Sequence, residues 1–386
     1  MLPVPVHHGY DMRCLGYTTG QFREWISRFS HYAGNDTCPH PVGTGRGHVF
    51  WHGSGHGPQA RAGRSASGSC PTDRTRGRHG IHVQAGAELE FYLLDPQTGQ
   101  PRDVGNDCYG LERAASFEHV LGPIRQQIDA IGIPIEQSNP EYAPGQVEVN
   151  MRYDSALLAA DRVVMFRSLV KQLATRHGYL ASFMAKPFID LGGNGFHLHY
   201  SLWSEGQNIF SDSGRLNDTG RHFLGGLQKR MVETSICGAA NVNSYRRRVP
   251  YSFCPTNASW GMDNRTVALR VIEGSDSATR VEKRDAGADC NPYLLMATDI
   301  AAGLDGIEEK QEPTEITTGD AYSDIHDEVL PTTLADAIRL ARESDWLASV
   351  LGAAQLETWL QQAERELKFF SDQVTPFETD RYLRRF

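Results

Sequence analysis

"GAELEFYLLD", residues 86–95, alternates between two kinds of side chain with a period of two. Glu88 and Glu90 fall on one face of an extended chain, whereas Leu89 and Phe91 fall on the other. Such alternation predicts a β-strand that buries its apolar face against a core. The opposite face of this strand is acidic.

Three further segments repeat the alternation, with these polar residues on one face: Gln146, Glu148 and Asn150 in 145–151; His197, His199 and Ser201 in 195–203; Arg280, Glu282 and Arg284 in 279–285. Apolar residues at helical spacing in 154–178 predict a helix of about six turns, capped by Asp154. A second helix is predicted to start at Pro292, and residues 333–370 have a helical period. The pattern indicates an α+β fold with a curved antiparallel sheet and helices on its outer face.

Composition limits the classes of partner. The chain has 386 residues, is 40% hydrophobic and contains no apolar run of the roughly 18 to 20 residues that span a bilayer. The net charge of -9 and the lack of a basic run argue against nucleic acid and membrane partners and favour small molecules. The seven cysteines form no CxxC motif, and the start lacks a signal-peptide pattern. We expect a cytoplasmic protein.

The chain divides by composition near residue 83. Residues 1–80 hold eight of the 15 histidines, nine arginines, no lysine and four acidic residues. Gly, Arg and His dominate there without apolar periodicity, so we expect residues 1–83 to be an atypical, poorly ordered segment. Residues 84–386 have the composition and apolar periodicity of one folded domain.

The polar strand faces indicate chemistry. A solvated sheet face also alternates, but here its polar positions are almost all carboxylates, imidazoles and guanidiniums. Glu88 and Glu90 would lie about 7 Å apart and repel each other unless a cation lies between them. Oxygen-rich ligands favour Mg²⁺ or Mn²⁺ over zinc, and arginines suit phosphate oxygens. Phosphoryl chemistry without a P-loop follows, since no GxxxxGK[ST], GxSxG or HExxH motif is present.

From Gln84 to the C-terminus, about four fifths of the chain, the sequence resembles the glutamine synthetases and the related γ-glutamyl-amine ligases. The resemblance rests on motifs in the order of that family: GAELEFYLLD, EYAPGQVEVN, FMAKPF followed by GGNGFHLHYSL, NSYRRRVP, WGMDNRTVALRV, TRVEKRDAGADCNPYL and AAGLDGIEEK. It implies the glutamine synthetase catalytic-domain fold. The family's N-terminal β-grasp domain is absent or unrecognisable in residues 1–83.

The resemblance also implies a role for each matching residue. Two metal ions, Mg²⁺ or Mn²⁺, would be held by Glu90, Glu141 and Glu148 and by Glu88, His197 and Glu282. Substrate glutamate would contact Gly193, Arg247 and Arg284, the transferred phosphate Arg265, and the nucleotide Ser201, Arg270 and Arg280. Arg265, Glu282 and Arg284 would be catalytic. His199 matches either a structural or a nucleotide-contacting residue. ATP would phosphorylate the γ-carboxylate of glutamate, and an amine would then displace phosphate.

The sequence departs from the family pattern at residues that are expected to contact the amine substrate. "VPYSFCP", residues 249–255, places Phe253 where glutamine synthetases carry the glutamate that binds ammonium. An aromatic ring suits a bulkier amine, so an organic amine is favoured as substrate, and Phe253 is predicted to contact it. Two alternatives stay open: a glutamine synthetase that uses ammonia, and a catalytically silent relative that binds glutamate or nucleotide. The resemblance further implies a homo-oligomeric ring, such as a dodecamer.

Overall fold

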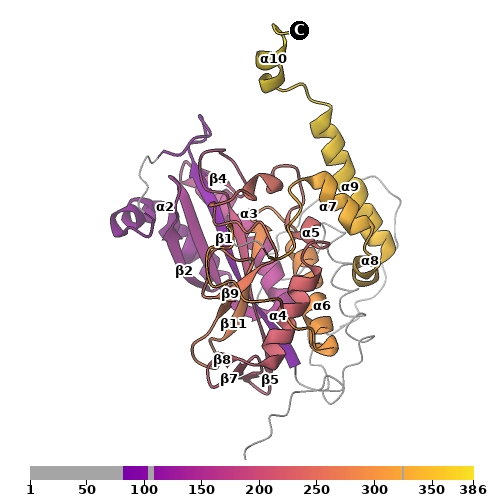
Figure 1. The fold of residues 1–386 in the computed structure, drawn as a ribbon. Helices are drawn as coiled ribbons and strands as arrows, with labels where there is room; N and C mark the ends of the chain where they lie inside the picture. Colours follow the sequence, from indigo (N-terminus) through magenta and orange to yellow (C-terminus); the bar gives the residue numbers. More distant parts are fainter. Residues whose placement is uncertain (1–80, 103–107, 324–325) are drawn as a thin grey trace, which may run out of the picture.

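The structure is a computed structural model that describes residues 81–102, 108–323 and 326–386 (Figure 1). Residues 1–80 lie outside the described residues, and with them almost all of the segment 1–83 that we expected to be poorly ordered. Residues 81–83 belong to the first strand, so regular structure begins slightly before the predicted boundary. None of the described helices is long and apolar enough to cross a membrane.

One large sheet forms the centre of the domain. Its strands are β1 (Ile81–Leu94), β2 (Ile135–Pro140), β3 (Gln146–Ser155), β4 (Leu180–Ser182), β5 (Gly195–Ser204), β6 (Gln207–Asn208), β9 (Trp260–Met262), β10 (Leu269–Ile272) and β11 (Arg280–Gly287). They are ordered β2-β3-β1-β5-β11-β10-β9, with β4 on β1 and β6 on β5. All pairs are antiparallel except β9 with β10, which makes the sheet mixed. A separate hairpin joins β7 (Ser211–Asp212) and β8 (Arg215–Leu216).

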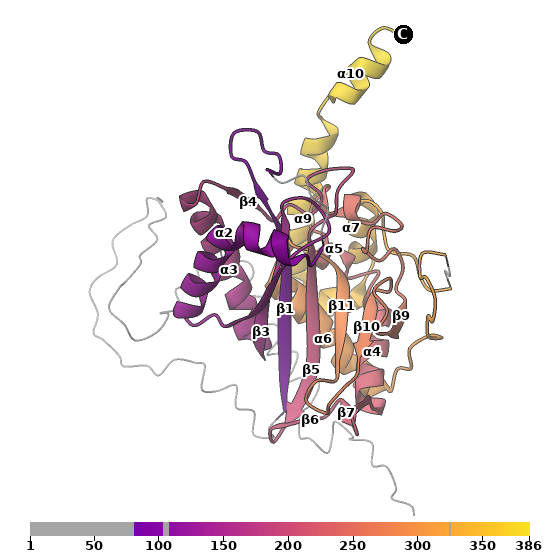
Figure 2. The same ribbon diagram turned by 90° about the vertical axis from the view of Figure 1, so that its left-hand side faces the viewer.

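The described helices are α2 (Leu111–Ala130), α3 (Ala156–Arg176), α4 (Asp218–Arg230), α5 (Ser235–Gly238), the 3-10 helix η3 (Ser244–Arg247), α6 (Pro292–Glu309), α7 (Leu334–Arg342), α8 (Asp345–Leu351), α9 (Ala353–Ser371) and α10 (Pro376–Tyr382). α3 packs against β1, β3 and β4, while α4 and α5 contact β11. In Figure 2 the long strands β1, β5 and β11 lie in front of α6 and α4. The helices α3, α4, α5 and α6 thus form a layer behind the sheet, whereas α10 projects away from the domain.

The core lies between the sheet and this helical layer. Leu89 and Phe91, the apolar residues of the opening motif, are fully buried there, as are Phe196 and Leu198 of β5. Burying each such side chain stabilises the fold by about 1.5 to 3 kcal/mol. The alternating residues of the same strands are consequently turned to the other face.

α4 and α6 touch through their backbones. A Cβ atom placed on Gly226 would collide with the carbonyl oxygen of Ala302, and one placed on Gly306 would collide with the carbonyl oxygen of His222. Only glycine permits this approach, since it has no Cβ. α6 is therefore held directly against α4.

The predicted α+β arrangement is confirmed, and two details differ. The helix after β3 begins at Ala156 rather than at an Asp154 cap, because β3 runs on to Ser155 and Asp154 pairs with Arg162 at 3.0 Å. The sheet is also not purely antiparallel, since β9 and β10 run parallel. Residues 333–370 are helical as expected, in the three helices α7, α8 and α9. The Ser344 side chain caps α8, and Gly352, at φ 85°, separates α8 from α9.

Candidate functional site

Strand pairing brings the predicted metal ligands together at the centre of the sheet. β1 lies between β3 and β5, with Glu90 opposite Glu148 and Glu88 opposite His197. Glu282 of β11 enters from the next strand along. Residues that are far apart in the sequence thus share one face because their strands alternate in phase.

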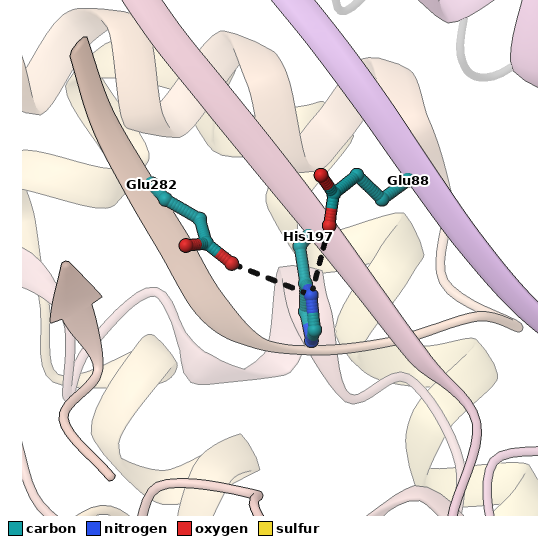
Figure 3. A group of neighbouring side chains, drawn as sticks. All are labelled: Glu88, His197 and Glu282. Carbon is teal, nitrogen blue, oxygen red and sulfur yellow. Dashed lines mark hydrogen bonds and ion pairs between the residues drawn. The ribbon is translucent and has the colours of Figure 1, made fainter. Parts of the chain in front are cut away.

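Glu88, His197 and Glu282 form the first group (Figure 3). The Nδ1 atom of His197 lies 3.4 Å from a carboxylate oxygen of Glu88 and 3.4 Å from one of Glu282. One ligand atom from each residue fits within 4.8 Å of the others. The predicted trio is therefore assembled around a space suited to a cation.

Glu90, Glu148 and again His197 form the second group, also within 4.8 Å. The prediction placed Glu141 here instead of His197, so the second trio is only partly brought together. Glu141 is buried beside Glu90, and its Oε1 atom has no hydrogen-bond partner. His197 is shared between the two groups.

The carboxylates of the second group repel one another. Burial, reinforced by Glu88, Glu90 and Glu141, raises the pKa of Glu148 to about 9. Burial and Glu90 raise the pKa of Glu141 to about 7. Carboxyls with raised pKa values on one half-buried face indicate a surplus of negative charge that a bound cation would relieve.

Cationic side chains instead stabilise the first group. Burial opposes ionisation of Glu282, but Arg284 and the histidines outweigh it and lower its pKa to about 2. The guanidinium of Arg284 contacts Glu282, and Arg270 donates to its other oxygen at 3.0 Å. Glu282 is thus held as a carboxylate, the state that a metal ligand needs.

The residues present fit divalent ions. Four carboxylates and one imidazole supply the ligand set, and the unpartnered buried oxygen of Glu141 offers a further donor. Hard oxygen ligands suit Mg²⁺ or Mn²⁺, whereas structural zinc sites use Cys and His in tetrahedral geometry. The chemistry of the donors thus agrees with the metal predicted from the sequence.

His199 lies between an arginine and a carboxylate. Arg280 donates to its Nδ1 atom at 3.0 Å, and its Nε2 atom lies 2.9 Å from Glu88. The Nδ1 atom is thus hydrogen-bonded, whereas Nε2 is near Glu88 without forming a hydrogen bond, so this geometry agrees with either of the two roles left open for His199. Arg280 is thereby placed on the same face as the acidic groups.

The other predicted arginines lie nearby. Arg265 is exposed, and its guanidinium lies 3.4 Å from the hydroxyl of Tyr109. Arg270 also pairs with Asp263, an exposed acid that sequence reasoning missed. No spacing rule marks Asp263, because it precedes β10 in a loop and acts through a contact seven residues away.

Gly193 lies against Arg247. A Cβ on Gly193 would come within 2.7 Å of the Arg247 side chain, so only glycine fits there. Arg247 is buried, donates to the backbone oxygen of Asp285 at 3.4 Å and has an unpartnered Nε atom. Gln146 donates to the backbone oxygen of Gly193 at 3.0 Å. The predicted glutamate-contacting residues Gly193 and Arg247 therefore lie together.

Two supporting residues received no role from the sequence. Gln146 lies 3.4 Å from Glu90, and Asn150 donates to Glu88 at 3.2 Å. Both were visible as polar positions on the same face as Glu148. Their amide groups orient the carboxylates on β1.

The remaining two predicted residues, Ser201 and Phe253, lie in different parts of the domain. Ser201, farther along β5, accepts a hydrogen bond from the indole of Trp203 at 2.9 Å. Phe253 is 52% exposed, and its ring lies 5.9 Å from that of Tyr142. Tyr142 directly follows Glu141, so Phe253 reaches the edge of the acidic site.

Comparison with known proteins agrees with this geometry. The sequence profile described as "Glutamine synthetase, catalytic domain" matches residues 73–382. A glutamate–isopropylamine ligase of a Pseudomonas species is 35% identical, over 79% of this chain and 70% of its own length. The γ-glutamylethanolamide synthetase of Streptomyces coelicolor is 36% identical, over 80% and 68%. The glutamine synthetase of Thermotoga maritima is 34% identical, over 79% and 72%.

Solved structures give the same result. The structure titled "GmaS/ADP complex" superposes with a TM-score of 0.72 at 32% identity and covers 79% of this chain and 74% of its own. Ligand-free GmaS gives the same score at 34% identity, over 79% and 73%. The chain therefore belongs to the glutamine synthetase family of ATP-dependent glutamate–ammonia or glutamate–amine ligases.

Proposed function

We propose that this ligase joins glutamate to an organic amine, in preference to ammonia, through a γ-glutamyl phosphate. The observation that carries the proposal is the pair of acidic groups that share His197, with arginines on the same face. An oxygen of the glutamate γ-carboxylate attacks the terminal phosphorus of ATP, and ADP leaves. The amine nitrogen then attacks the acyl carbon, loses a proton, and phosphate departs.

Each side chain has a place in this scheme. Two divalent ions, held as the resemblance assigns them, would neutralise charge on the phosphates. Arg265 would face the transferred phosphate, and Arg247 and Arg284 would hold the glutamate carboxylates. The nucleotide would contact Ser201, Arg270 and Arg280. Arg247 and Arg284 are buried, and the contacts of Arg270 with Glu282 and of Arg280 with His199 hold these side chains in place, which supports pre-organisation.

Phe253 and Tyr142 support the choice of an organic amine. Their rings meet in a T-shaped arrangement beside Glu141, and each is about half exposed: 52% and 53%. Phe253 has a φ of 59°, a conformation that costs a residue with a Cβ about 1 to 3 kcal/mol. Such strain is typical of functional positions. Two rings offer apolar area to an alkyl or aryl group and cation–π attraction to a substituted ammonium.

We also propose a cytoplasmic homo-oligomer, such as a ring. At the C-terminal end, five apolar residues are well exposed in the single chain: Phe369, Val374, Phe377, Leu383 and Phe386. Several exposed apolar side chains within one short segment favour an interface. Analytical ultracentrifugation of the full chain tests the assembly, and a monomer at micromolar concentration would contradict it.

Phosphate release tests the reaction. The purified chain is assayed with Mg²⁺, ATP and glutamate against ammonia, alkyl amines, polyamines, ethanolamine and anilines. Release that requires glutamate and one organic amine, and that is lost in Glu148→Ala, supports the proposal. Preference for ammonia would show a glutamine synthetase. Binding of ATP without release by any amine would show a silent relative.

Phe253→Glu isolates the contribution of the ring. The variant restores a carboxylate and removes the aromatic contact with Tyr142, so the ratio of kcat/KM for the organic amine to that for ammonia should fall at least tenfold. Ser252→Ala in the same loop serves as the control, because its hydroxyl donates to the backbone and does not face the site. An unchanged ratio in Phe253→Glu would remove this residue from amine selection.

A further inference from the structure

β11 contains a bulge beside the acidic site. Lys283 pairs with Leu198 of β5, and Ala286 pairs with Phe196. Two residues of β11, Arg284 and Asp285, therefore lie opposite the single residue between those partners, His197. A bulge of this kind bends a strand and redirects its side chains.

The two bulge residues serve opposite faces of the sheet. Arg284 turns toward the site, where its guanidinium contacts Glu282. Asp285 turns toward the helical layer and is only 1% exposed. The bulge thus determines where Arg284 lies relative to His197, which both acidic groups share.

A buried ion network holds the helix-facing side of the bulge. The ammonium of Lys283 lies 2.9 Å from Asp285 and 3.1 Å from Asp299 of α6. The hydroxyl of Tyr200, on β5, donates to Asp299 at 2.9 Å. Arg248 lies 3.7 Å from the other oxygen of Asp285. The network therefore connects the bulge, the neighbouring strand, α6 and the segment after η3.

Stability alone does not account for these charges. Burial opposes the charge on Lys283, but Asp285 and Asp299 outweigh it and keep the pKa of Lys283 above its ordinary value. Buried ion pairs are generally no more stabilising than apolar side chains of the same size, and their best-attested use is to fix register. At this bulge, register decides which side chains face the metal groups.

We propose that Lys283, Asp285 and Asp299 are positioning residues that lock the β11 bulge and thereby hold Glu282 and Arg284 against His197. They touch neither substrate nor metal and act through the strand that carries those two side chains. The link to turnover rests on the proposed function, whereas the effect on metal affinity does not depend on which amine is used.

The test is the double variant Lys283→Met and Asp299→Asn. Methionine matches the length of lysine, asparagine retains an acceptor for Tyr200, and Asp285 keeps Arg248 as a partner. Binding of Mn²⁺ alone is titrated by electron paramagnetic resonance, and hydrogen exchange is followed in peptides that cover 280–290. Asp299→Asn alone leaves the Lys283–Asp285 pair intact and provides a milder variant should the double variant fail to fold.

Thr298→Val is the matched control. Thr298 is fully buried on α6 next to Asp299, and its hydroxyl contacts the backbone oxygens of Leu294 and Leu295 and the thiol of Cys237, none of which belongs to the ion network. The control reports what a change in the helical layer does without loss of the ion network.

The double variant should bind Mn²⁺ 10- to 100-fold more weakly, the usual effect of losing a residue that supports a metal ligand. Amides of the bulge should exchange at least tenfold faster, and Asp299→Asn should show smaller changes in the same direction. Wild-type Mn²⁺ affinity in the double variant, or an equal loss in Thr298→Val, would overturn the proposal. Wild-type protein that binds Mn²⁺ but turns over no amine would contradict the proposed function alone. Absence of Mn²⁺ binding in the wild type would overturn both.

Discussion

Replacing Glu148 by glutamine is expected to stabilise the metal-free protein. Glu148 lies on β3 opposite Glu90 and is 8% exposed, so its carboxyl is held among other carboxyls with little water. Glutamine has nearly the same shape but never carries a charge. The substitution thus removes the ionisable carboxyl group at this position and leaves the packing of the side chain unchanged.

The magnitude follows from the pKa of this carboxyl, which is raised from 4.5 to about 9 in the folded protein. Between these values the unfolded chain is ionised and the folded chain holds a proton, so folding takes up a proton and the stability contributed by Glu148 falls as pH rises. At pH 7.5 the penalty is the 3 units above 4.5 multiplied by about 1.36 kcal/mol, or ~4 kcal/mol. Glu148→Gln should recover up to this amount.

Thermal unfolding in EDTA measures the effect. In a protein of this size, ~4 kcal/mol corresponds to a rise of roughly 5 °C in Tm at pH 7.5, and the gain should shrink toward pH 5. With Mn²⁺ at 100 times its Kd the difference should narrow to about 1 kcal/mol, because this ligand stabilises the wild type by about 2.7 kcal/mol and the variant has lost a ligand. Glu136→Gln, an exposed change on neighbouring β2, is the control for loss of one charge.

Two results would refute this reasoning. One is a Tm of the variant in EDTA that equals or falls below that of the wild type at pH 7.5. The other is a rise in Tm with Mn²⁺ that is the same for Glu148→Gln and the wild type. Either would mean that Glu148 is ionised without metal or takes no part in binding it.

Three further changes test other parts of the site. Gly193→Ala should raise the KM for glutamate at least tenfold, because the Cβ of the alanine would come within 2.7 Å of Arg247. The KM for ATP should change little, and phosphate release at varied concentrations of each substrate measures both KM values. Arg270→Ala removes a charged hydrogen bond of 3.0 Å to Glu282 and should raise the KM for ATP about tenfold in the same assay; an unchanged KM would argue against a nucleotide contact. Lys283→Met alone leaves buried acids undercompensated and should lower the free energy of unfolding in urea by about 3 to 5 kcal/mol, whereas a loss below 1 kcal/mol would contradict the buried ion network.

The sequence predicted most of the site because strand alternation is a local property. Glu88, Glu90 and Glu148 could be assigned to one face from a period of two, and their meeting required only that β1 and β3 be neighbours. The resemblance, through the fold that it implies, supplied this pairing of strands. It also supplied Glu141, which lies in a turn where no period applies.

The parts that escaped prediction depend on tertiary contacts. That His197 serves both acidic groups follows from sheet register, which alternation does not specify. The Lys283–Asp299 contact joins a strand to a helix, and no local period predicts which buried charges of two separate elements will pair. The division of residues 333–370 came from Ser344 and Gly352, whose capping and turn conformations interrupt a continuous helical period.

The glycine contact between α4 and α6 has a mechanical consequence. Helices that meet through interleaved side chains can slide by small rotamer changes, which is how shear motions occur in enzymes. At Gly226 and Gly306 there are no such side chains to readjust. The two helices are therefore expected to move together as one rigid body. Any movement that accompanies turnover is then expected in the loops on the open side of the sheet, such as residues 249–255, while the layer that anchors Asp299 stays still.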